Sequence, residues 1–534
     1  MWQQVYDPVA GSLQLSALVA LLPVFVLLFL LAVMRTPSWL AAIAGFVTSA
    51  IVAVAVYHMP FSLALSTTLY GAAYGLLPIG WIVFTAILLY KITVETGKFE
   101  IIKNSLSNLT GDQSVQALLI AFAFGAFIEG AAGFGTPVAI AAAMLVGLGF
   151  RPFFAASICL LANTSPVAFG SIGTPLVMLQ AVTKLPMEAL SANVGRLCAP
   201  ISLIIPSYLI LVMGGMPALR AAFPAAVVCG LAFSVTQFVV SNYLGPYLTD
   251  ILGAIVAMGS LYLLLKVWRP AGDDKKPNTR FTTAEVLQAW APYMFLVVFV
   301  LIWGYPVTKK ILDTTTHQIQ WPGLHNQIMR MAPVTSGPSP YGAMYALNLL
   351  SASGTSCLFA VFASALLLKV SPARLAAYTW DTAKQLALPL VTIMSVLALA
   401  YVMNYSGQTA TLGLVMAATG SAFPFFSTLL GWLGVFLTGS DTAANGLFGT
   451  LQEVTANKLG LNPALMAAAN SSGGVMGKMI SLQSIAVAVS ATQMPRSEEA
   501  NLLRFTLKHS VFLTCLVGLL TLFYAYVMPQ WAAR

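Results

Sequence analysis

The stretch FGAFIEGAAGFGTP, residues 124–137, places a single carboxylate inside a long apolar tract. Glu129 is the only charged residue between Asp112 and Arg151, and small glycine and alanine residues lie on both sides of it. Irregular backbone at membrane depth is tolerated only where protein or a water-filled cavity surrounds it. The glycines and Pro137 therefore predict a membrane helix that breaks beside a buried functional group.

The composition of the whole chain supports a membrane protein. Of its 534 residues, 59% are hydrophobic and only 8% are charged, whereas soluble globular chains carry about 25% charged residues. Residues 36–90 and 385–440 contain no Lys, Arg, Asp or Glu. The apolar runs are continuous and lack the alternating polarity of barrel strands. We expect an all-α polytopic membrane protein with about 12–14 transmembrane helices plus re-entrant or broken helices.

The net charge of +9 does not indicate nucleic-acid binding, because basic residues of membrane proteins collect in cytoplasmic loops. The polar loop at 266–285 has three acids and five bases, namely Lys266, Arg269, Lys275, Lys276 and Arg280. We expect it to be a cytoplasmic linker between a first membrane half, 1–265, and a second, 286–534. A second polar loop, 305–340, is expected on the outer side.

Enzyme chemistry has no support in the sequence. The five cysteines lie in or beside apolar runs without a CxxC spacing, and no histidine has a metal-ligand neighbour three or four residues away. Walker A, HExxH and GxSG-like motifs are missing. We therefore expect no metal, no cofactor and no enzymatic activity. The apolar run 15–34 is interpreted as a retained first span rather than a cleaved signal peptide.

Motifs of the first half recur in the same order in the second half, which indicates two related halves. The pairs are GAFIEGAA (125–132) with GVFLTGSD (434–441), GFRPFFAAS (149–157) with GLNPALMAA (460–468), and ANTSPVAFGS (162–171) with ANSSGGVMGK (469–478). Many secondary transporters are built from such repeats and bind their substrate near the bilayer midplane, where broken helices of the two repeats meet. We expect the functional site there.

Glu129 is the candidate proton carrier of that site. A charged side chain at the bilayer centre costs about 2.5–3.5 kcal/mol on insertion scales, and burial favours the neutral, protonated form. The alternative is a helix-packing residue bonded to a neighbour. Ser440 and Asp441 occupy the matching region of the second half. We expect Asp441 to be a second proton or cation site and Ser440 to contact substrate, although both residue types are also good helix N-caps.

Uncharged donors and acceptors follow in both halves, and they suit a small carboxylate that carries a hydroxyl group. The candidate substrate-binding residues of this kind are Asn163, Thr164, Ser165, Asn470 and Ser471. Hydrogen bonding between helices is the alternative role for such residues. Lys478 lies deep in an apolar stretch and is the candidate to neutralise an anion. Arg196 is a further candidate, whereas Arg151 is better explained as an interfacial anchor.

At these motifs the chain resembles the L-lactate permease family, which includes glycolate permeases. The resemblance covers essentially the whole chain and is carried by WQQVYDP (2–8), FGAFIEGAAGFGTPVAI (124–140), NTSPVAFGSIGTP (163–175), LGWLGVFLTGSDTAAN (430–445), AANSSGGVMGKMISLQSIA (468–486) and LRFTLKHS (503–510). The family pattern has a proline where this chain has Leu482, which weakens the expectation of a helix break there.

The resemblance implies a symporter of the bacterial inner membrane that takes up L-lactate, D-lactate and glycolate with protons. Its partners would be the small 2-hydroxy acid, protons and membrane lipid, and the sequence leaves the oligomeric state open. Sodium coupling is the closest alternative, a passive anion channel is a second, and a membrane-embedded enzyme is the least supported because no nucleophile–base or metal constellation is found.

Overall fold

The computed structural model describes residues 1–133, 135–270 and 281–533. Within these ranges, 11 helices are long and apolar enough to cross a membrane, and one helix pair bent by 62° gives up to 12 spans. The predicted all-α polytopic membrane protein is therefore confirmed. Part of the predicted linker at 266–285, including Lys275, Lys276 and Arg280, lies outside the described residues.

The first part of the chain is helical apart from one short strand. It contains β1 (Trp2–Gln3), α1 (Leu13–Ala32), α2 (Ser38–Ala55), α3 (Phe61–Tyr74), the π-helix η1 (Gly75–Gly80), α4 (Trp81–Glu95), α5 (Lys98–Ser107) and α6 (Gln113–Gln116). It continues with the π-helix η2 (Ala117–Phe124), α7 (Gly125–Ala131), α8 (Thr136–Gly147), α9 (Pro152–Ala162), the 3₁₀-helix η3 (Val167–Phe169), α10 (Gly170–Thr183), α11 (Met187–Tyr243) and α12 (Thr249–Val267).

The second part adds four strands and a further set of helices. It contains α13 (Thr283–Gly304), α14 (Pro306–Asp313), β2 (His317–Gln320), β3 (Ile328–Arg330), β4 (Ser339–Pro340), β5 (Met344–Leu347), α15 (Ser353–Leu367) and α16 (Pro372–Ser406). It ends with α17 (Gln408–Met416), η4 (Ala417–Ala422), α18 (Phe423–Thr438), α19 (Asp441–Leu459), α20 (Pro463–Lys478), α21 (Leu482–Ala491), η5 (Arg496–Glu498), α22 (Glu499–Tyr526) and η6 (Pro529–Trp531).

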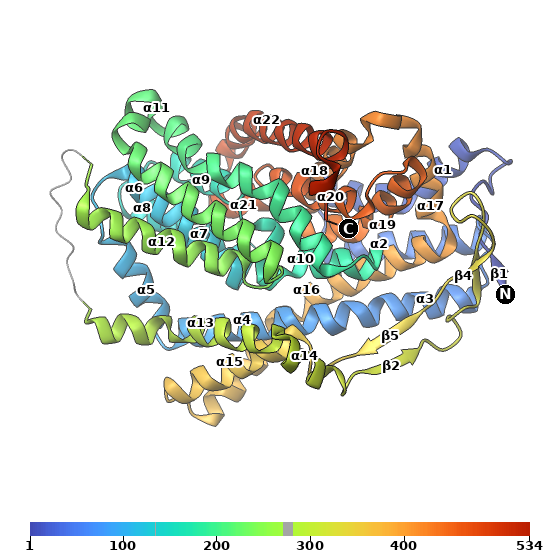
Figure 1. Cartoon of the computed structure of the whole chain (residues 1–534), viewed down its shortest axis with the longest axis horizontal. Coiled ribbons are helices and arrows are strands. Elements are labelled where there is room, and N and C mark those ends of the chain that lie inside the picture. The colour runs from blue at the N-terminus through green and yellow to red at the C-terminus, as the bar shows by residue number, and fades with distance from the viewer. Residues whose placement is uncertain (134, 271–280, 534) are drawn as a thin grey trace.

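The helices have their ends at two opposite faces of the molecule (Figure 1). We call the end where α12 stops and α13 starts the linker face, and the end that carries the strands and the N-terminus the strand face. Lys98 Nζ donates to Gln288 Oε1 at 2.8 Å, which holds the start of α5 at the linker face. Gln4 Nε2 donates to the carbonyls of Asn404 and Tyr405 at 2.9 Å, which fixes the end of α16 at the strand face.

The polar loop predicted at 305–340 folds as a small cap over the strand face. Its strands β3 and β4 join the N-terminal β1 in a three-stranded sheet of order β1-β3-β4, and its strand β2 pairs antiparallel with β5, which follows the loop. Tyr70 Oη donates to the Met344 carbonyl at 2.8 Å, and Tyr345 Oη donates to the Leu77 carbonyl at 3.1 Å. Burial raises the pKa of Tyr345 to about 12, so this hydroxyl stays a neutral donor that attaches the cap to the helices.

The first re-entrant hairpin enters from the linker face. The segment α6–η2–α7 leads inward from α5, the chain turns after Ala131, and α8 leads back. Phe153, one residue after α9 begins, packs its ring 5.6 Å from that of Phe505 near the start of α22. Gly135 closes the turn with φ of 82°, a left-handed conformation that glycine adopts without steric cost.

The second re-entrant hairpin enters from the opposite, strand face. α18 leads inward to Gly439, and α19 returns, where Thr450 Oγ1 donates to the Val182 carbonyl at the end of α10 (2.9 Å). Tyr401 Oη, which donates to the Ala181 carbonyl at 2.6 Å, lies beside Tyr70 and therefore next to the cap. The repeated motifs GAFIEGAA and GVFLTGSD run into the two hairpin turns, and the two hairpins enter from opposite faces.

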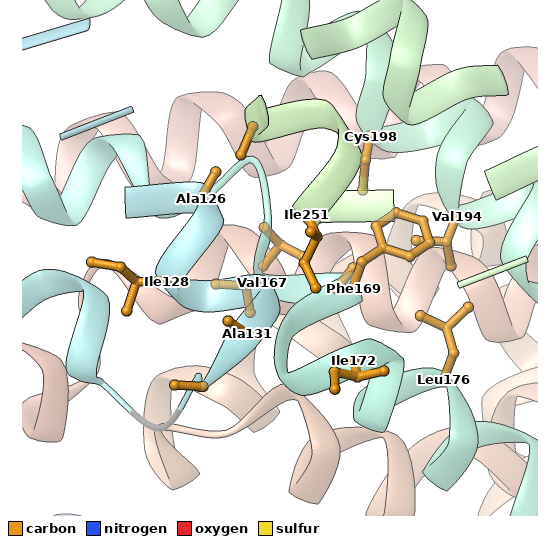
Figure 2. Packing of buried hydrophobic residues seen from close by; sticks show 14 of the residues in the cluster. Ala126, Ile128, Ala131, Val167, Phe169, Ile172, Leu176, Val194, Cys198 and Ile251 are labelled. Atoms are coloured by element: carbon orange, nitrogen blue, oxygen red, sulfur yellow. The ribbon is translucent and has the colours of Figure 1, made fainter. Parts of the chain in front are cut away.

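Each hairpin is followed by a broken helix. Pro152 and Pro463 occupy the first helical turn of α9 and α20, as expected for proline, which lacks the N–H that a first turn leaves unused. α9 breaks after Ala162 and resumes through η3 as α10, and α20 breaks after Lys478 and resumes as α21. Figure 2 shows apolar side chains of α7, α10, α11 and α12 gathered around the first break.

Small residues let the second hairpin and its broken helix approach closely. A Cβ built on Gly431 of α18 would lie 1.8 Å from the carbonyl oxygen of Asn470 in α20, and a Cβ on Gly477 would lie 2.4 Å from the Trp432 carbonyl oxygen. Helix association in membranes depends on such close packing, because lipid offers no hydrophobic drive between helices. These glycines set the distance between the elements that carry Asp441 and Lys478.

Candidate functional site

The two hairpin turns and the two helix breaks meet at a small cavity of about 70 Å³. Its lining comes from α7, η3, α10, the α18–α19 turn, α20 and α21: Glu129, Val167, Gly170, Ser171, Thr174, Pro175, Gly439, Ser440, Asp441, Thr442, Lys478 and Gln483. A single water needs about 10–15 Å³ of such space, so the cavity admits a small solute. Four residues predicted from the sequence line it: Glu129, Ser440, Asp441 and Lys478.

Glu129 lies in the last turn of α7 with only 4% of its surface exposed. A Cβ added at Gly170 would lie 2.7 Å from Glu129 Oε1, so the absence of a side chain there leaves room for the carboxyl group. The amide of Asn163 approaches the carboxyl from the end of α9. Within the described part of the chain, however, Glu129 Oε2 completes no hydrogen bond. The carboxyl is therefore held in place but left available for a ligand or proton.

Lys478 is the cation that faces both acidic residues of the cavity. It ends α20, is 8% exposed, and donates from Nζ to the Gly439 carbonyl at 2.5 Å. The charges of Glu129 and Asp441 act on it electrostatically, although among the described residues it forms no ion pair within 4.0 Å. Its position at a helix C-terminus is favourable for a cation, because the helix dipole is negative there.

Ser440 and Asp441 start α19 at the turn of the second hairpin. Ser440 Oγ accepts from the Ala443 N–H at 3.2 Å, so Ser440 caps the helix and also lines the cavity. Asp441 Oδ2 accepts from Ser471 Oγ at 2.6 Å and from Asn445 Nδ2 at 3.3 Å. Asp441 Oδ1 has no partner in the described ranges. One carboxylate oxygen is thus fixed by the protein and the other is free to bind.

Asn470 belongs to an amide network behind the cavity rather than to its lining. Asn470 Nδ2 donates to Asn445 Oδ1 at 3.0 Å, and Gln452 Nε2 donates to Asn470 Oδ1 at 3.0 Å. Asn445 Nδ2 also donates to the Pro175 carbonyl at 3.1 Å, which joins α19 to α10. Asn445 and Gln452 were not predicted from the sequence. Their seven-residue spacing places both on one face of α19, and this spacing could have indicated a shared polar contact.

Asn163, Thr164 and Ser165 lie at the first helix break, behind Glu129 and outside the cavity lining. Thr164 Oγ1 donates to the Leu161 carbonyl at 2.7 Å, and Gln237 Nε2 donates to the Ser165 carbonyl at 2.9 Å. Both amide atoms of Asn163 and the Ser165 hydroxyl are buried without a partner in the part of the chain that the structure describes. The lining residues that sequence analysis missed here are Gly170, Ser171 and Thr174.

Two sequence expectations need correction. Arg196 does not reach the site: its Nε donates to Asn242 Oδ1 at 2.8 Å and its Nη1 to the Trp531 carbonyl, so it ties α11 to the C-terminal segment. The helix break near Leu482 is present although the proline is missing. Ser481 caps α21 by accepting from the Ser484 N–H at 3.2 Å, and serine is among the preferred residues at a helix N-cap.

A wide vestibule of about 980 Å³ connects this region to the linker face. It lies between the α1–α2 turn, the end of α18, and α21 with α22, and its rim includes Arg35, Gln493 and Glu499. Gly439 and Gln483 line both the vestibule and the small cavity. At the strand face, the rings of Tyr70, Tyr74 and Tyr401 pack together, and Tyr70 is hydrogen-bonded to the cap. The structure is therefore open toward the linker face.

The chain matches a known protein family over nearly its whole length. Residues 16–528 match the family model described as L-lactate permease. The chain is 45% identical to the L-lactate permease of Bacillus subtilis, over 97% of this chain and 98% of that protein. It is 43% identical to the glycolate permease GlcA of Escherichia coli, over 98% of each chain. Among solved structures, MtrF of Neisseria gonorrhoeae matches with a TM-score of 0.48 at 13% identity, covering 87% of this chain and 84% of that one.

The relatives are named permeases, which are transporters and not enzymes. With the membrane spans described above, the chain is a multi-pass protein of the bacterial plasma membrane. The full-length match to the family model and the identities above 40% over nearly the whole chain leave one assignment. The chain belongs to the L-lactate permease family.

Proposed function

We propose that this protein is a secondary transporter that takes up L-lactate and related 2-hydroxymonocarboxylates, D-lactate and glycolate among them, together with protons. The observation that carries the proposal is the cavity that Lys478 lines together with two buried acidic residues, Glu129 and Asp441, whose charges act on it. The lysine can bind the carboxylate of a monocarboxylate anion, and the neighbouring acidic side chains can bind the proton that is transported with it. The names of the relatives supply the substrate class.

Each group has a role in this scheme. Lys478 neutralises the substrate carboxylate, Ser440 in the lining is a hydroxyl partner for the substrate, and Ser471 donates to Asp441 from behind the lining. Glu129 and Asp441 bind the coupled proton. Asn163, Thr164, Ser165 and Asn470 position the cavity walls from behind. A lactate anion with one proton is a neutral load, so the membrane potential does not oppose its uptake.

Alternating access follows from the inverted hairpins. The vestibule opens the cavity to the linker face, which the positive-inside bias assigns to the cytoplasm. Transport requires a second state in which the vestibule closes and the strand side opens. We propose that residues 1–265 and 286–534 form the two moving halves and that 266–285 connects them on the cytoplasmic side.

Glu129→Gln in proteoliposomes tests the proton role. Glutamine keeps the shape of the side chain in the space above Gly170 but cannot carry a proton. Under an imposed pH gradient the variant should fail to accumulate labelled L-lactate, while exchange of internal for external lactate, which moves no net proton, should persist. Glu188→Gln, which changes an exposed carboxylate at the start of α11, is the matched control.

Three outcomes would contradict the proposal. Normal accumulation by Glu129→Gln would remove Glu129 from proton coupling. Loss of wild-type uptake when external sodium is replaced by choline would establish sodium coupling instead. Flux without accumulation against a gradient would identify a passive channel. Competition among L-lactate, D-lactate and glycolate in the same vesicles, with and without a protonophore, ranks the substrates.

A further inference from the structure

A third buried carboxylate lies next to Glu129 and has no role so far. Asp250 is in the first turn of α12 and is 1% exposed. Neither of its carboxylate oxygens has a hydrogen-bond partner in the described chain, and the residue does not cap its helix, because the N-cap position belongs to Leu248. An unpartnered buried carboxylate is costly, so its retention calls for a bound group.

Asp250 is placed beside Glu129 by close backbone packing. A Cβ built on Gly130, the residue after Glu129, would lie 2.8 Å from Asp250 Cβ and 3.2 Å from the backbone nitrogen of Ile251. Figure 2 shows Ile251 among the side chains of α7 and the η3–α10 segment. Only a glycine at position 130 allows α12 to lie so close to α7, and the negative charges of the two acids oppose each other.

Asn163 adds a second, independent observation. Its amide approaches the Glu129 carboxyl but leaves both of its own polar atoms unpartnered within the described ranges. The charged and titratable groups that face this cluster come from three further elements: Lys478 of α20, Asp441 of α19, and the Cys198 thiol of α11. Among these groups Lys478 acts on Glu129 and Asp441, which leaves Asp250 without a compensating cation in the described chain.

We propose that Asp250 is a second proton-binding group of the transport site and shares a proton with Glu129. Two neighbouring carboxylates in a low-dielectric site cannot both be ionised, so the pair retains at least one proton. The proton passes from the carboxylic O–H of one residue to a carboxylate oxygen of the other, and no electrons are transferred. The inference rests on the proposed proton symport and identifies where the proton resides when Glu129 releases it.

The position of Asp250 also suggests the side from which the proton arrives. The α11–α12 loop, which precedes it, has Tyr243 77% exposed and Leu244 54% exposed. A Cβ built on Gly195, near the start of α11, would overlap the side chain of Ser241, near the end of α11. Both ends of this helix therefore lie on the strand side. Asp250 therefore lies toward the strand side, opposite the vestibule, which favours arrival of the proton from that side.

The pH dependence of lactate uptake by Asp250→Asn tests the inference. The charge of Glu129 opposes ionisation of Asp250, so Asp250 holds the proton when Glu129 is ionised. Without Asp250, uptake depends on protonation of Glu129 alone, which requires a lower pH. The pH of half-maximal uptake should fall by about one unit or more, while lactate exchange continues. Asp250→Glu, which restores a carboxyl, should return the profile toward that of the wild type, and Glu188→Gln should leave it unchanged. A wild-type profile for a folded Asp250→Asn protein would overturn the inference.

If Asp250→Asn does not fold, chemical labelling of the wild type and of Glu129→Gln tests the inference instead. Dicyclohexylcarbodiimide, an apolar reagent, modifies protonated buried carboxyls, and mass spectrometry locates the adduct. Modification of Asp250 is expected, and it should decrease in Glu129→Gln, because the charge that opposes ionisation of Asp250 is then missing. Complete absence of an Asp250 adduct in both proteins would overturn the inference. If wild-type vesicles accumulate no lactate under a pH gradient, the proposed function itself fails, whereas accumulation with an unmodified Asp250 rejects only its role.

Discussion

Replacing Lys478 by methionine should destabilise the protein, and adding Asp441→Asn should recover part of the loss. Methionine retains the length of the side chain but removes the buried charge that faces Asp441 and Glu129. Removing one partner of a buried charge pair leaves the other uncompensated, which is the costly event. Neutralising Asp441 in the same chain removes that uncompensated charge, so the two substitutions together should cost less than their sum.

The structure bounds the size of this coupling. Two unit charges 4 Å apart attract by about 4 kcal/mol at an effective dielectric constant of 20. No ion pair within 4.0 Å joins Lys478 to an acid among the described residues, so about 4 kcal/mol is an upper limit. Interacting neighbours in double-mutant cycles typically couple by about 0.5–3 kcal/mol. We expect about 1–3 kcal/mol, equivalent to roughly five- to hundredfold in the folding equilibrium.

The assay is the free energy of unfolding in detergent for the wild type, both single variants and the double variant. Lys91 and Asp381, an ion pair of 3.4 Å with side chains 18% and 54% exposed, provide the matched control cycle. Their coupling should stay below about 1 kcal/mol because solvent screens it. Additivity of Lys478→Met and Asp441→Asn to within about 0.5 kcal/mol would refute the idea that the two residues neutralise each other.

Two further changes test the packing and the orientation. Gly431→Ala should lower the free energy of unfolding by about 1–3 kcal/mol, because the added Cβ would overlap the Asn470 carbonyl oxygen. The control is Gly147→Ala, whose Cβ meets nothing within 4 Å and which should be neutral in the same unfolding assay. Equal effects of the two substitutions would contradict the close contact of α18 with α20. Ser490→Cys in the vestibule should react with a membrane-impermeant maleimide only in inside-out vesicles, and Ser336→Cys, exposed in the cap, only in right-side-out vesicles. The reverse labelling pattern would mean that the vestibule opens to the outside.

The fold class could be predicted because it depends on local composition. A hydrophobic run of sufficient length becomes a membrane helix whatever its neighbours are. The interruptions were equally visible: Pro152 and Pro463 begin helices, and Gly439 ends one with φ of 72°. The repeated motifs marked both hairpin turns. Buried acids in apolar tracts are rare enough that Glu129 and Asp441 were found from their surroundings alone.

The direction of the two hairpins and the partners of each polar residue were decided only by the tertiary structure. Opposite insertion of the halves brings Lys478 beside Glu129, although hundreds of positions separate them, and it moves Asn470 and Asn163 behind the cavity wall. Asp250 begins a helix near the end of the first half, where a sequence pattern suggests an ordinary first-turn acid. The hydropathy of a segment indicates only whether that segment lies in lipid. The distance between two side chains depends on how closely remote helices approach each other. Glycines such as Gly130 and Gly431 set that distance through contacts with distant helices, which no local sequence pattern contains.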